Sequence, residues 1–257
     1  MTVKAAGAGT ESAERVADVL LAFARTNSSI GVSALARDLD LSKAVVHRIL
    51  QSLVSRGLLQ YSAKSRDYSL GPSATVLGAR ALRQLDVRTV GREPLLRLRD
   101  TTGETTTLSL LTADSRAYVD QYESPNEIKM TVELGRMYPL HAGSSSRAIL
   151  AHLPASQIEH IIQRGLDPLT SHTLTDADEL RHQLDQVRKL GYARSVGERQ
   201  AGAGSIASPV FGMRDDVIGS ISVCGPLSRF NDEAVSRFIP FVVSTAREIS
   251  KGMHATR

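Results

Sequence analysis

The sequence of 257 residues contains one cysteine and no tryptophan, and aromatic residues make up only 4% of it. A single cysteine forms no intramolecular disulfide and supplies no multi-cysteine metal site. We therefore expect a reducing, cytoplasmic setting. The scarcity of aromatic side chains also argues against a stacking platform for single-stranded nucleic acid.

Long apolar segments are missing as well. A membrane helix needs about 18 consecutive apolar residues, and the sequence contains no such run. The first ten residues are mostly small and lack the apolar core of a secretory signal. We therefore expect neither membrane contact nor secretion, and we predict that residues 1–11 form a flexible N-terminus.

The sequence also lacks the residue patterns that are typical of metal and cofactor sites. The seven histidines show no metal-ligand spacing. The turn at Gly202, Ala203 and Gly204 has no strand–glycine–helix unit around it, which a dinucleotide site requires. We predict no metal site, no cofactor and no catalytic residue.

The charge that is present is unevenly distributed. Residues 1–85 contain eleven Lys and Arg against six Asp and Glu, a net charge of +5, whereas the whole chain carries +4. The net positive charge therefore lies in the first third of the chain. Such a distribution is typical of a domain that contacts the DNA backbone, although ordinary basic domains are common.

Residues 42–53 form the most informative segment, because helical spacing divides them into two different faces. Ser42 is a good N-cap residue. The apolar stripe at i, i+3, i+4 and i+7 consists of Val46, Ile49, Leu50 and Leu53. The opposite face carries Lys43, Ala44, His47, Arg48 and Gln51. This polar face suits the edge of a DNA major groove. A solvated surface helix would show the same pattern. The neighbouring segments therefore have to distinguish a DNA-recognition helix from an ordinary surface helix.

The segments before it complete a helix-turn-helix. Residues 16–23 have apolar side chains at helical spacing, and Gly31 breaks the chain after them. Residues 33–39 are predicted to form a short second helix capped by Ser33, and residues 39–41 a tight turn. Helix, helix, turn and helix with three apolar stripes can close one small core.

A β-hairpin wing is predicted directly after these helices. Residues 57–61 and 67–71 are short strand-like runs joined by a polar turn. Lys64 and Arg66 lie at the turn, where a wing would meet phosphates. We predict a winged helix-turn-helix domain over residues 12–71. Its predicted DNA contacts are Ser42, Lys43, Ala44, His47, Arg48, Gln51, Lys64 and Arg66.

A connecting helix is predicted over residues 72–86. Its apolar seam at helical spacing consists of Ala74, Leu77, Gly78, Ala81, Leu82 and Leu85. Such a seam can pack within its own chain or against a second copy. Pairing would suit a DNA-binding protein with one recognition helix, because two half-sites raise specificity.

Residues 87–257 are predicted to form a second domain of the α+β class. A helix is expected over 90–102, with Pro94 tolerated only in its first turn. Strands are expected over 104–112, 115–123, 128–134, 192–196, 205–211 and 217–224. Further helices are expected over 144–151, 154–164, 176–190 and 232–251. Strands flanked by helices, with hairpins between them, indicate a sensor-like domain.

Six motifs, in their order and spacing, resemble the IclR family of bacterial transcriptional regulators. They are residues 42–50 (SKAVVHRIL), 68–71 (YSLG), 140–142 (LHA), 191–193 (GYA), 205–210 (SIASPV) and 221–226 (ISVCGP), followed by Arg229. The resemblance extends over essentially the whole chain. It implies a mostly α winged helix-turn-helix, a connecting helix and a GAF-like α+β effector-binding domain. It also implies homodimers, often paired into tetramers on double-stranded operator DNA, that control catabolic genes in response to a small organic acid or an aromatic compound.

The resemblance further implies an effector pocket in the second domain. Its residues, carried over by motif, are Ala142, Gly143, Ser144 and Ser145 in a loop and Ser195, Ser205, Ser222 and Cys224 on strands. The chemistry agrees in part, because N–H groups at a helix N-terminus and uncharged hydroxyls suit a small carboxylate. A serine-rich capped loop without a ligand would look similar. Ser195 and Ser205 replace a carboxylate and a cysteine of the family's founding member, so the identity of the effector does not carry over.

Two alternatives remain open. A hydrolase-like enzyme built on residues 87–257 would need an activated nucleophile, and Ser146 lacks the Gly-x-Ser-x-Gly frame that exposes one. A DNA-binding module that has lost its ligand response would differ in failing to bind organic acids. We predict a ligand-responsive DNA-binding regulator rather than an enzyme.

Overall fold

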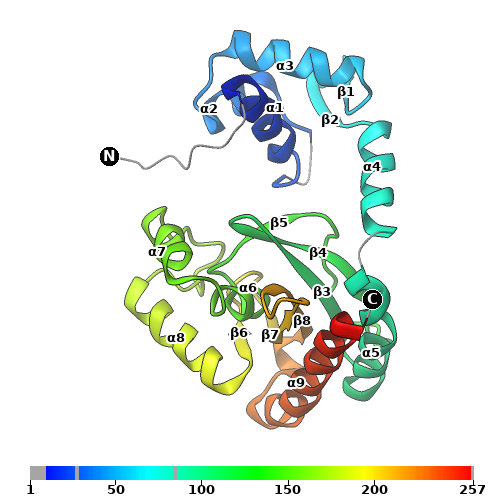
Figure 1. The fold of residues 1–257 in the computed structure, drawn as a ribbon, viewed down its shortest axis with the longest axis vertical. Coiled ribbons are helices and arrows are strands. Elements are labelled where there is room, and N and C mark those ends of the chain that lie inside the picture. Colours follow the sequence, from blue (N-terminus) through cyan, green and yellow to red (C-terminus); the bar gives the residue numbers. More distant parts are fainter. Residues whose placement is uncertain (1–9, 27–28, 84–85, 256–257) are drawn as a thin grey trace. The chain divides into compact units, whose positions relative to one another are not determined.

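The computed structural model describes residues 10–26, 29–83 and 86–255. The chain divides into two units, Met1–Gln84 and Leu85–Arg257, and each has its own hydrophobic core (Figure 1). Within the described ranges, no helix is long and apolar enough to cross a membrane.

The N-terminal unit has the expected winged helix-turn-helix fold. Its elements are α1 (Glu11–Ala22), α2 (Val32–Asp38), α3 (Lys43–Ser55), β1 (Leu59–Ser62), β2 (Asp67–Leu70) and α4 (Pro72–Arg83). The apolar stripes of the first three helices close one core together with Leu59 of β1 and Tyr68 of β2. The helical periodicity of the sequence therefore predicted this core correctly.

α1 starts close to the end of the predicted flexible N-terminus. Its first residue is Glu11, and Thr10 is its N-cap. Residues 1–9 lie outside the described residues. The start of α1 follows from a polar cap ahead of an apolar periodic segment, which is a common helix start.

α2 starts one residue earlier than predicted and has a different cap. Its N-cap is Gly31, in an extended conformation, and no side chain caps the helix, so the prediction that Ser33 caps it is wrong. The chain just before this point forms an antiparallel bridge between Ile30 and Tyr68. Because this bridge holds the chain extended up to Ile30, the helix begins directly at Val32.

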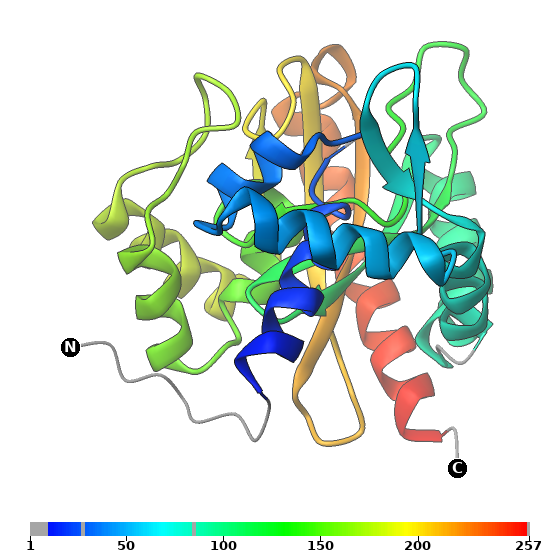
Figure 2. The same cartoon turned by 90° about the horizontal axis from the view of Figure 1, so that it is seen from above.

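The wing is an antiparallel hairpin whose register places Ser62 opposite Asp67. The turn occupies residues 63–66, and Arg66 there has a φ of 59°, in the left-handed region. Figure 2 shows the hairpin (cyan) next to the C-terminal end of α3.

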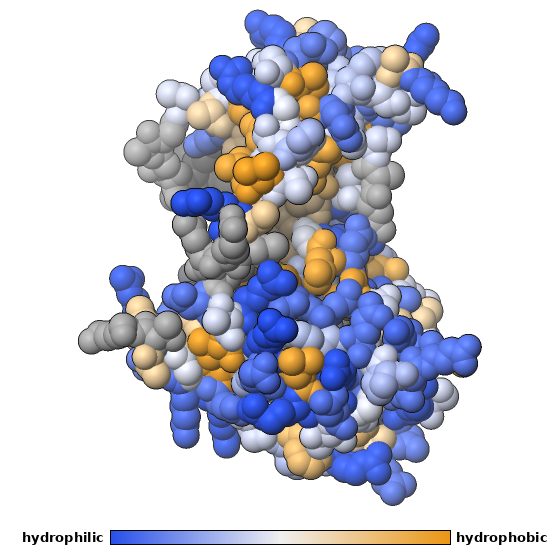
Figure 3. All heavy atoms as spheres, turned by 90° about the vertical axis from the view of Figure 1, so that its right-hand side faces the viewer, coloured by the Kyte–Doolittle hydropathy of each residue, from blue (hydrophilic) through white to orange (hydrophobic). Residues whose placement is uncertain are grey.

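α4 follows the wing and leaves part of its apolar seam exposed. The helix ends at Arg83, and residues 84 and 85 of the predicted connecting helix lie outside the described residues. The Leu77 side chain is 61% exposed, and Ala81 is exposed as well. Figure 3 looks onto the side of this unit where α4 lies and shows apolar side chains (orange) at the surface.

The C-terminal unit is an α+β domain built on a six-stranded antiparallel sheet of order β5-β4-β3-β8-β7-β6 (Figure 1). Its helices are α5 (Asp86–Thr102), α6 (Ser144–Leu150), α7 (Ala155–Gln163), α8 (Ala177–Leu190), η1 (Leu227–Arg229) and α9 (Asp232–Ala255). Its strands are β3 (Thr105–Thr112), β4 (Ser115–Tyr122), β5 (Met137–Pro139), β6 (Ala193–Val196), β7 (Ala203–Phe211) and β8 (Val217–Pro226). α5 and α9 pack on one face of the sheet, and α6, α7 and α8 belong to a second core on the other.

The two faces of the central strands differ in polarity because side chains alternate along a strand. Ile206, Ile221 and Val223 point into the core under α5 and α9. The intervening positions on β8, Ser220 and Ser222, are buried and polar. The sheet therefore presents a hydroxyl-bearing face on the side of α6, which is where the effector pocket was predicted.

The predicted strand at residues 128–134 is wrong, and the third strand of the C-terminal unit is β5. Gln121 explains why residues 128–134 stay out of the sheet. Its side-chain amide donates to the Val132 carbonyl at 3.0 Å, and its side-chain carbonyl accepts the Val132 N–H at 2.9 Å. This side chain satisfies the backbone groups that a neighbouring strand would otherwise pair. β5 instead pairs with the start of β4, where Ser115 lies opposite Pro139.

The helix that precedes β3 is longer than predicted. α5 begins at Asp86 rather than residue 90, and Pro94 lies in its interior rather than in its first turn. Proline lacks the N–H that an interior position donates. Burial outweighs this loss, because Leu95 and Leu98 on the same helix are almost fully buried against α9. Gly252 of α9 allows the close approach, since an added Cβ there would clash with the Val90 side chain of α5.

Candidate nucleic-acid interface and effector site

α3 presents the two faces that its sequence predicts. The Ser42 hydroxyl caps the helix by accepting the Val45 N–H at 3.3 Å. The predicted apolar stripe, Val46, Ile49, Leu50 and Leu53, is buried. The opposite face is exposed and carries the helix residues predicted to contact DNA, namely Ser42, Lys43, Ala44, His47, Arg48 and Gln51. The Ser42 hydroxyl accepts in the cap and can still donate a proton to a phosphate.

Gln51 connects α3 to the wing. Its side-chain amide donates to the Tyr68 hydroxyl at 3.3 Å. Tyr68 is 3% exposed, and its ring lies 4.9 Å from that of Tyr61. Part of the hydrogen-bonding capacity of Gln51 is therefore used inside the domain, where it sets the position of the wing relative to α3.

The cations of this surface have no carboxylate partner among the described residues. Lys43 and Arg48 on α3, and Lys64 and Arg66 on the wing turn, are all exposed. Within the described part of the chain, none of the four forms an ion pair with a carboxylate. Unpaired surface cations are available to phosphates without first breaking an internal contact.

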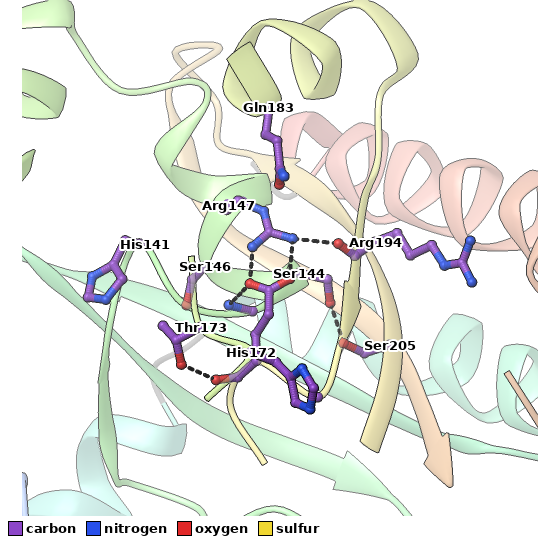
Figure 4. Close-up of polar contacts among 12 residues, drawn as sticks. His141, Ser144, Ser146, Arg147, His172, Thr173, Gln183, Arg194 and Ser205 are labelled. Atoms are coloured by element: carbon purple, nitrogen blue, oxygen red, sulfur yellow. Dashed lines mark hydrogen bonds and ion pairs between the residues drawn. The ribbon is translucent and has the colours of Figure 1, made fainter. Parts of the chain in front are cut away.

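Three of the predicted effector residues lie side by side across three strands. Ser195 of β6 is opposite Ser205 of β7, and Ser205 is opposite Cys224 of β8. The Ser144 hydroxyl at the start of α6 lies 2.7 Å from the Ser205 hydroxyl (Figure 4). The loop and the strands that the family motifs singled out are therefore brought together by the fold.

Of the remaining predicted residues, Ser145 connects α6 to the sheet, whereas Ser222 bonds to a neighbouring strand within it. The Ser145 carbonyl accepts the Ser220 hydroxyl at 3.0 Å, and the Ser222 hydroxyl lies 2.7 Å from that of Thr107. Ser222 is 1% exposed, and Ala142 is fully buried. Buried hydroxyl groups therefore lie next to the start of α6 and on the central strands of the sheet.

The N-terminus of α6 already holds a carboxylate of the chain itself. Gly143, at a φ of 90°, donates its N–H to Glu198 at 3.2 Å. The same carboxylate forms a buried ion pair with Arg147, whose side chain is labelled in Figure 4. The Glu198 carbonyl accepts the Thr173 hydroxyl at 2.6 Å. The free helix N-terminus that the sequence suggested is therefore occupied at Gly143.

Cys224 is a buried thiol of low reactivity. Burial raises the pKa of its thiol to about 12, and the nearby Arg199 and Arg116 only partly oppose this effect. The thiolate is the reactive form of cysteine. Cys224 therefore remains protonated near neutral pH and acts as a small apolar side chain of the site.

Several polar residues of this region were missed in the sequence. They are Arg116 and Tyr118 on β4, Tyr138 on β5, Arg147 on α6, and Glu198 and Arg199 in the loop after β6. Arg116 and Tyr118 occupy alternate positions of a predicted strand, so the strand period places them on one face. The sequence pattern of β4 does not show that this face of the strand packs against α6.

A separate cavity of about 830 Å³ lies between β6, α8 and α9. Tyr192, Val196, Gln186 and Ile239 are among its lining residues. None of the predicted effector residues lines it. It shares only the Arg147–Glu198 pair with the region described above.

The two units together define a class of protein. A winged helix-turn-helix with an exposed cationic face marks a DNA-binding regulator. Residues 12–63 match the IclR helix-turn-helix domain, and residues 79–251 match the family described as bacterial transcriptional regulator IclR C-terminal. The chain belongs to the IclR family of bacterial transcriptional regulators.

Individual relatives agree with this assignment. The HTH-type transcriptional regulator BhcR of Paracoccus denitrificans is 32% identical over 95% of this chain and 88% of its own length. The acetate operon repressor of Salmonella typhimurium is 26% identical over 91% of this chain and 87% of its own. The crystal structure of an IclR transcriptional regulator from Alicyclobacillus acidocaldarius matches with a TM-score of 0.78 and 29% identity, covering 95% of this chain and 99% of the other.

Proposed function

We propose that this chain binds a double-stranded operator through α3 and the wing, and that a small organic anion held in the C-terminal domain modulates this binding. The observation that carries the proposal is the exposed polar face of α3, whose cations are free of internal ion pairs. The similarity to the acetate operon repressor of Salmonella typhimurium supports catabolic genes as the targets.

The two groups of basic residues have different proposed roles. Arg48 on α3 contacts base edges in the major groove, where an arginine can donate two hydrogen bonds to guanine. Lys64 and Arg66 on the wing contact phosphates, which orient the domain and bind any sequence. Selection of bound sequences from a random DNA pool by the full chain tests whether the protein recognises a specific operator. We expect enrichment of one sequence, and a chain that enriches none would refute operator recognition.

We also propose that the chain acts as a homodimer joined through α4, and that dimers pair into tetramers on the operator. The exposed Leu77 supports this, because an exposed large apolar side chain gains stability when a second copy covers it. Leu77→Asp should shift the full chain towards monomer in analytical ultracentrifugation. Thr75→Asp, an exposed position about half a turn away, is the control and should leave the mass unchanged.

The effector is proposed to bind at the loop and strand residues Ala142, Gly143, Ser144, Ser145, Ser195, Ser205, Ser222 and Cys224. The alignment of Ser195, Ser205 and Cys224 across three strands supports one shared site. A thermal-shift panel of organic acids on the full chain should find one that stabilises it, as any ligand of the native state does.

The thermal-shift measurement also distinguishes the proposed effector site from the separate cavity next to β6, α8 and α9. Ser205→Ala should weaken the effect of that acid, because a hydroxyl is lost beside the loop. Ser236→Ala, which lines the separate cavity, should not. The opposite result would place the ligand in that cavity.

A further inference from the structure

The C-terminal domain contains two arginines that no carboxylate neutralises. Arg116 of β4 is 1% exposed, and Arg199, in the loop after β6, is half-buried. Neither forms an ion pair with any carboxylate of residues 10–26, 29–83 or 86–255. Burying a cation without a counter-charge is costly, and buried charges are normally paired.

The hydrogen bonds of Arg116 confirm that its partners are neutral. Its Nε donates to the Ser146 hydroxyl at 2.8 Å, its Nη1 to the Ser109 hydroxyl at 3.0 Å, and its Nη2 to the Tyr118 hydroxyl at 3.1 Å. A guanidinium has five N–H groups, so one N–H on each terminal nitrogen is left without an acceptor among the described residues. Two unused donors on one guanidinium can bind the two oxygens of a carboxylate.

The guanidinium groups of both arginines lie near the same two tyrosine rings. The guanidinium carbon of Arg116 lies 4.3 Å from the ring centre of Tyr118 and 5.2 Å from that of Tyr138. The guanidinium carbon of Arg199 lies 5.7 Å and 5.3 Å from the same two ring centres. The rings attract both cations but carry no net charge. Two positive charges therefore lie near the same two rings in a partly buried region.

This region adjoins the proposed effector residues. A Cβ added to Gly143 would lie 3.6 Å from the Cβ of Arg199. Both arginines are close enough to Cys224 to lower the pKa of its thiol against the effect of burial. Ser146, which accepts from Arg116, lies in the first turn of α6. The cations, the loop and the strand residues surround the same region.

The other nearby positive groups are already neutralised. Glu198 is paired with Arg147 and also accepts the Gly143 N–H. Arg229 is paired with the buried Glu104. Arg136, whose guanidinium carbon lies 5.2 Å from the Tyr138 ring centre, is paired with Glu133. Among the described residues around the site, Arg116 and Arg199 are therefore the cations without a carboxylate partner.

We propose that Arg116 and Arg199 bind the carboxylate of the effector, beside the rings of Tyr118 and Tyr138. This inference rests on the proposed effector function and deepens it, because it makes an acid group the required feature of the ligand. A carboxylate completes the hydrogen bonds of Arg116 and balances the charge of both arginines. A neutral analogue of the same shape does neither.

The test uses matched acid and amide pairs on the full chain: acetate and acetamide, succinate and succinamide, benzoate and benzamide. We expect at least one acid to raise the melting temperature at constant ionic strength, and its amide to have no effect. Calorimetric titration with that acid should show a Kd that rises roughly tenfold or more in Arg199→Gln, since a charged hydrogen bond is lost. Arg199→Lys should recover part of the affinity, because it restores the charge without the planar fork.

Arg199 is chosen for substitution because it lies in a loop and is half exposed, so the fold should survive. Arg237→Gln is the control, since Arg237 also lies over an aromatic ring, 5.4 Å from the centre of Phe238, but on the exposed side of α9. Its affinity for the acid should equal that of the wild type.

Three results would overturn the proposal: no acid of the panel stabilises the wild type, an amide binds as well as its acid, or Arg199→Gln binds the acid with unchanged Kd. If binding depends on Ser205 but not on Arg199, the effector function stands and this inference fails. If an acid binds but never alters operator affinity, the carboxylate site stands and the proposed regulation fails.

Discussion

Arg147 of α6 and Glu198 of the loop after β6 form a buried ion pair whose side chains are 2% and 11% exposed. Arg147 Nη2 lies 2.8 Å from one carboxylate oxygen, and Nη1 donates to the other. Arg147 also donates to the Arg194 carbonyl, and Glu198 accepts the Gly143 N–H. One pair therefore connects α6, the effector loop and the edge strand β6.

Breaking this pair should destabilise the C-terminal domain. Glu198→Gln keeps the shape of the side chain but leaves the Arg147 charge buried without a partner, which typically costs about 3–5 kcal/mol. Scanning calorimetry of the full chain should show a lower melting temperature for the C-terminal transition. The double variant Arg147→Met, Glu198→Gln should lose less than the sum of the two single changes, because the buried charge is gone. Strict additivity would show that the pair is not coupled.

Substitution of Arg48 tests the recognition face of α3. Arg48→Ala should weaken specific operator binding by about 1–3 kcal/mol, as expected for a base-edge contact. Gel-shift titration at fixed salt measures this loss. Arg56→Ala, an exposed arginine at the other end of the same helix, serves as control and should bind nearly as the wild type. Equal losses in both variants would indicate a general charge effect.

Substitutions on the wing test the phosphate contacts. Lys64→Ala should weaken binding to all DNA sequences alike and reduce the dependence of log affinity on log salt by roughly one unit. Arg66→Gly should do the same without loss of stability, because glycine adopts the positive φ of this position freely. A loss confined to one operator base pair, with an unchanged salt slope, would argue against wing–phosphate contact.

The C-terminal domain should lose stability in mild acid. Burial lowers the pKa of His141, although its hydrogen bond with the Asp167 carbonyl opposes this, and burial also lowers the pKa of His152. Both are therefore favoured as neutral imidazoles in the folded state. As the pH falls below the ordinary value of 6.5, the unfolded chain binds protons that the folded chain does not, so stability is complete above about pH 6.5 and decreases below it.

His152 allows this pH dependence to be tested. Its buried Nε2 has no hydrogen-bond partner among the described residues, and its ring packs 5.1 Å from that of Phe211. His152→Leu, of similar volume, should narrow the drop in melting temperature between pH 7.5 and 5.5 by roughly 2–4 °C. His182→Leu, at an exposed histidine of α8 that contacts Gln186, is the control and should leave the drop unchanged. An equal narrowing in both variants would mean that burial is not the cause.

The boundaries between elements show where local patterns stop being informative. Residues 128–134 have the composition of a strand, yet the Gln121 side chain pairs with Val132 and takes the place of a strand ladder. Pro94 marks a helix start in sequence, yet lies inside α5 because the burial of Leu95 and Leu98 outweighs one missing hydrogen bond. In both cases a long-range contact overrides a local preference.

The sequence by itself determined the two faces of α3, the wing and the alternation along β8, because each depends on a period of two or 3.6 residues that local order defines. It also determined which family motifs are present, and hence the candidate effector residues. Only the tertiary structure decided the charge balance around them. Arg116, Arg147, Glu198 and Arg199 lie far apart in the chain, and nothing local shows that Glu198 neutralises Arg147 while Arg116 and Arg199 keep their charge. Pairing between charges depends on distance and burial, which exist only once the sheet, the loop and α6 have come together.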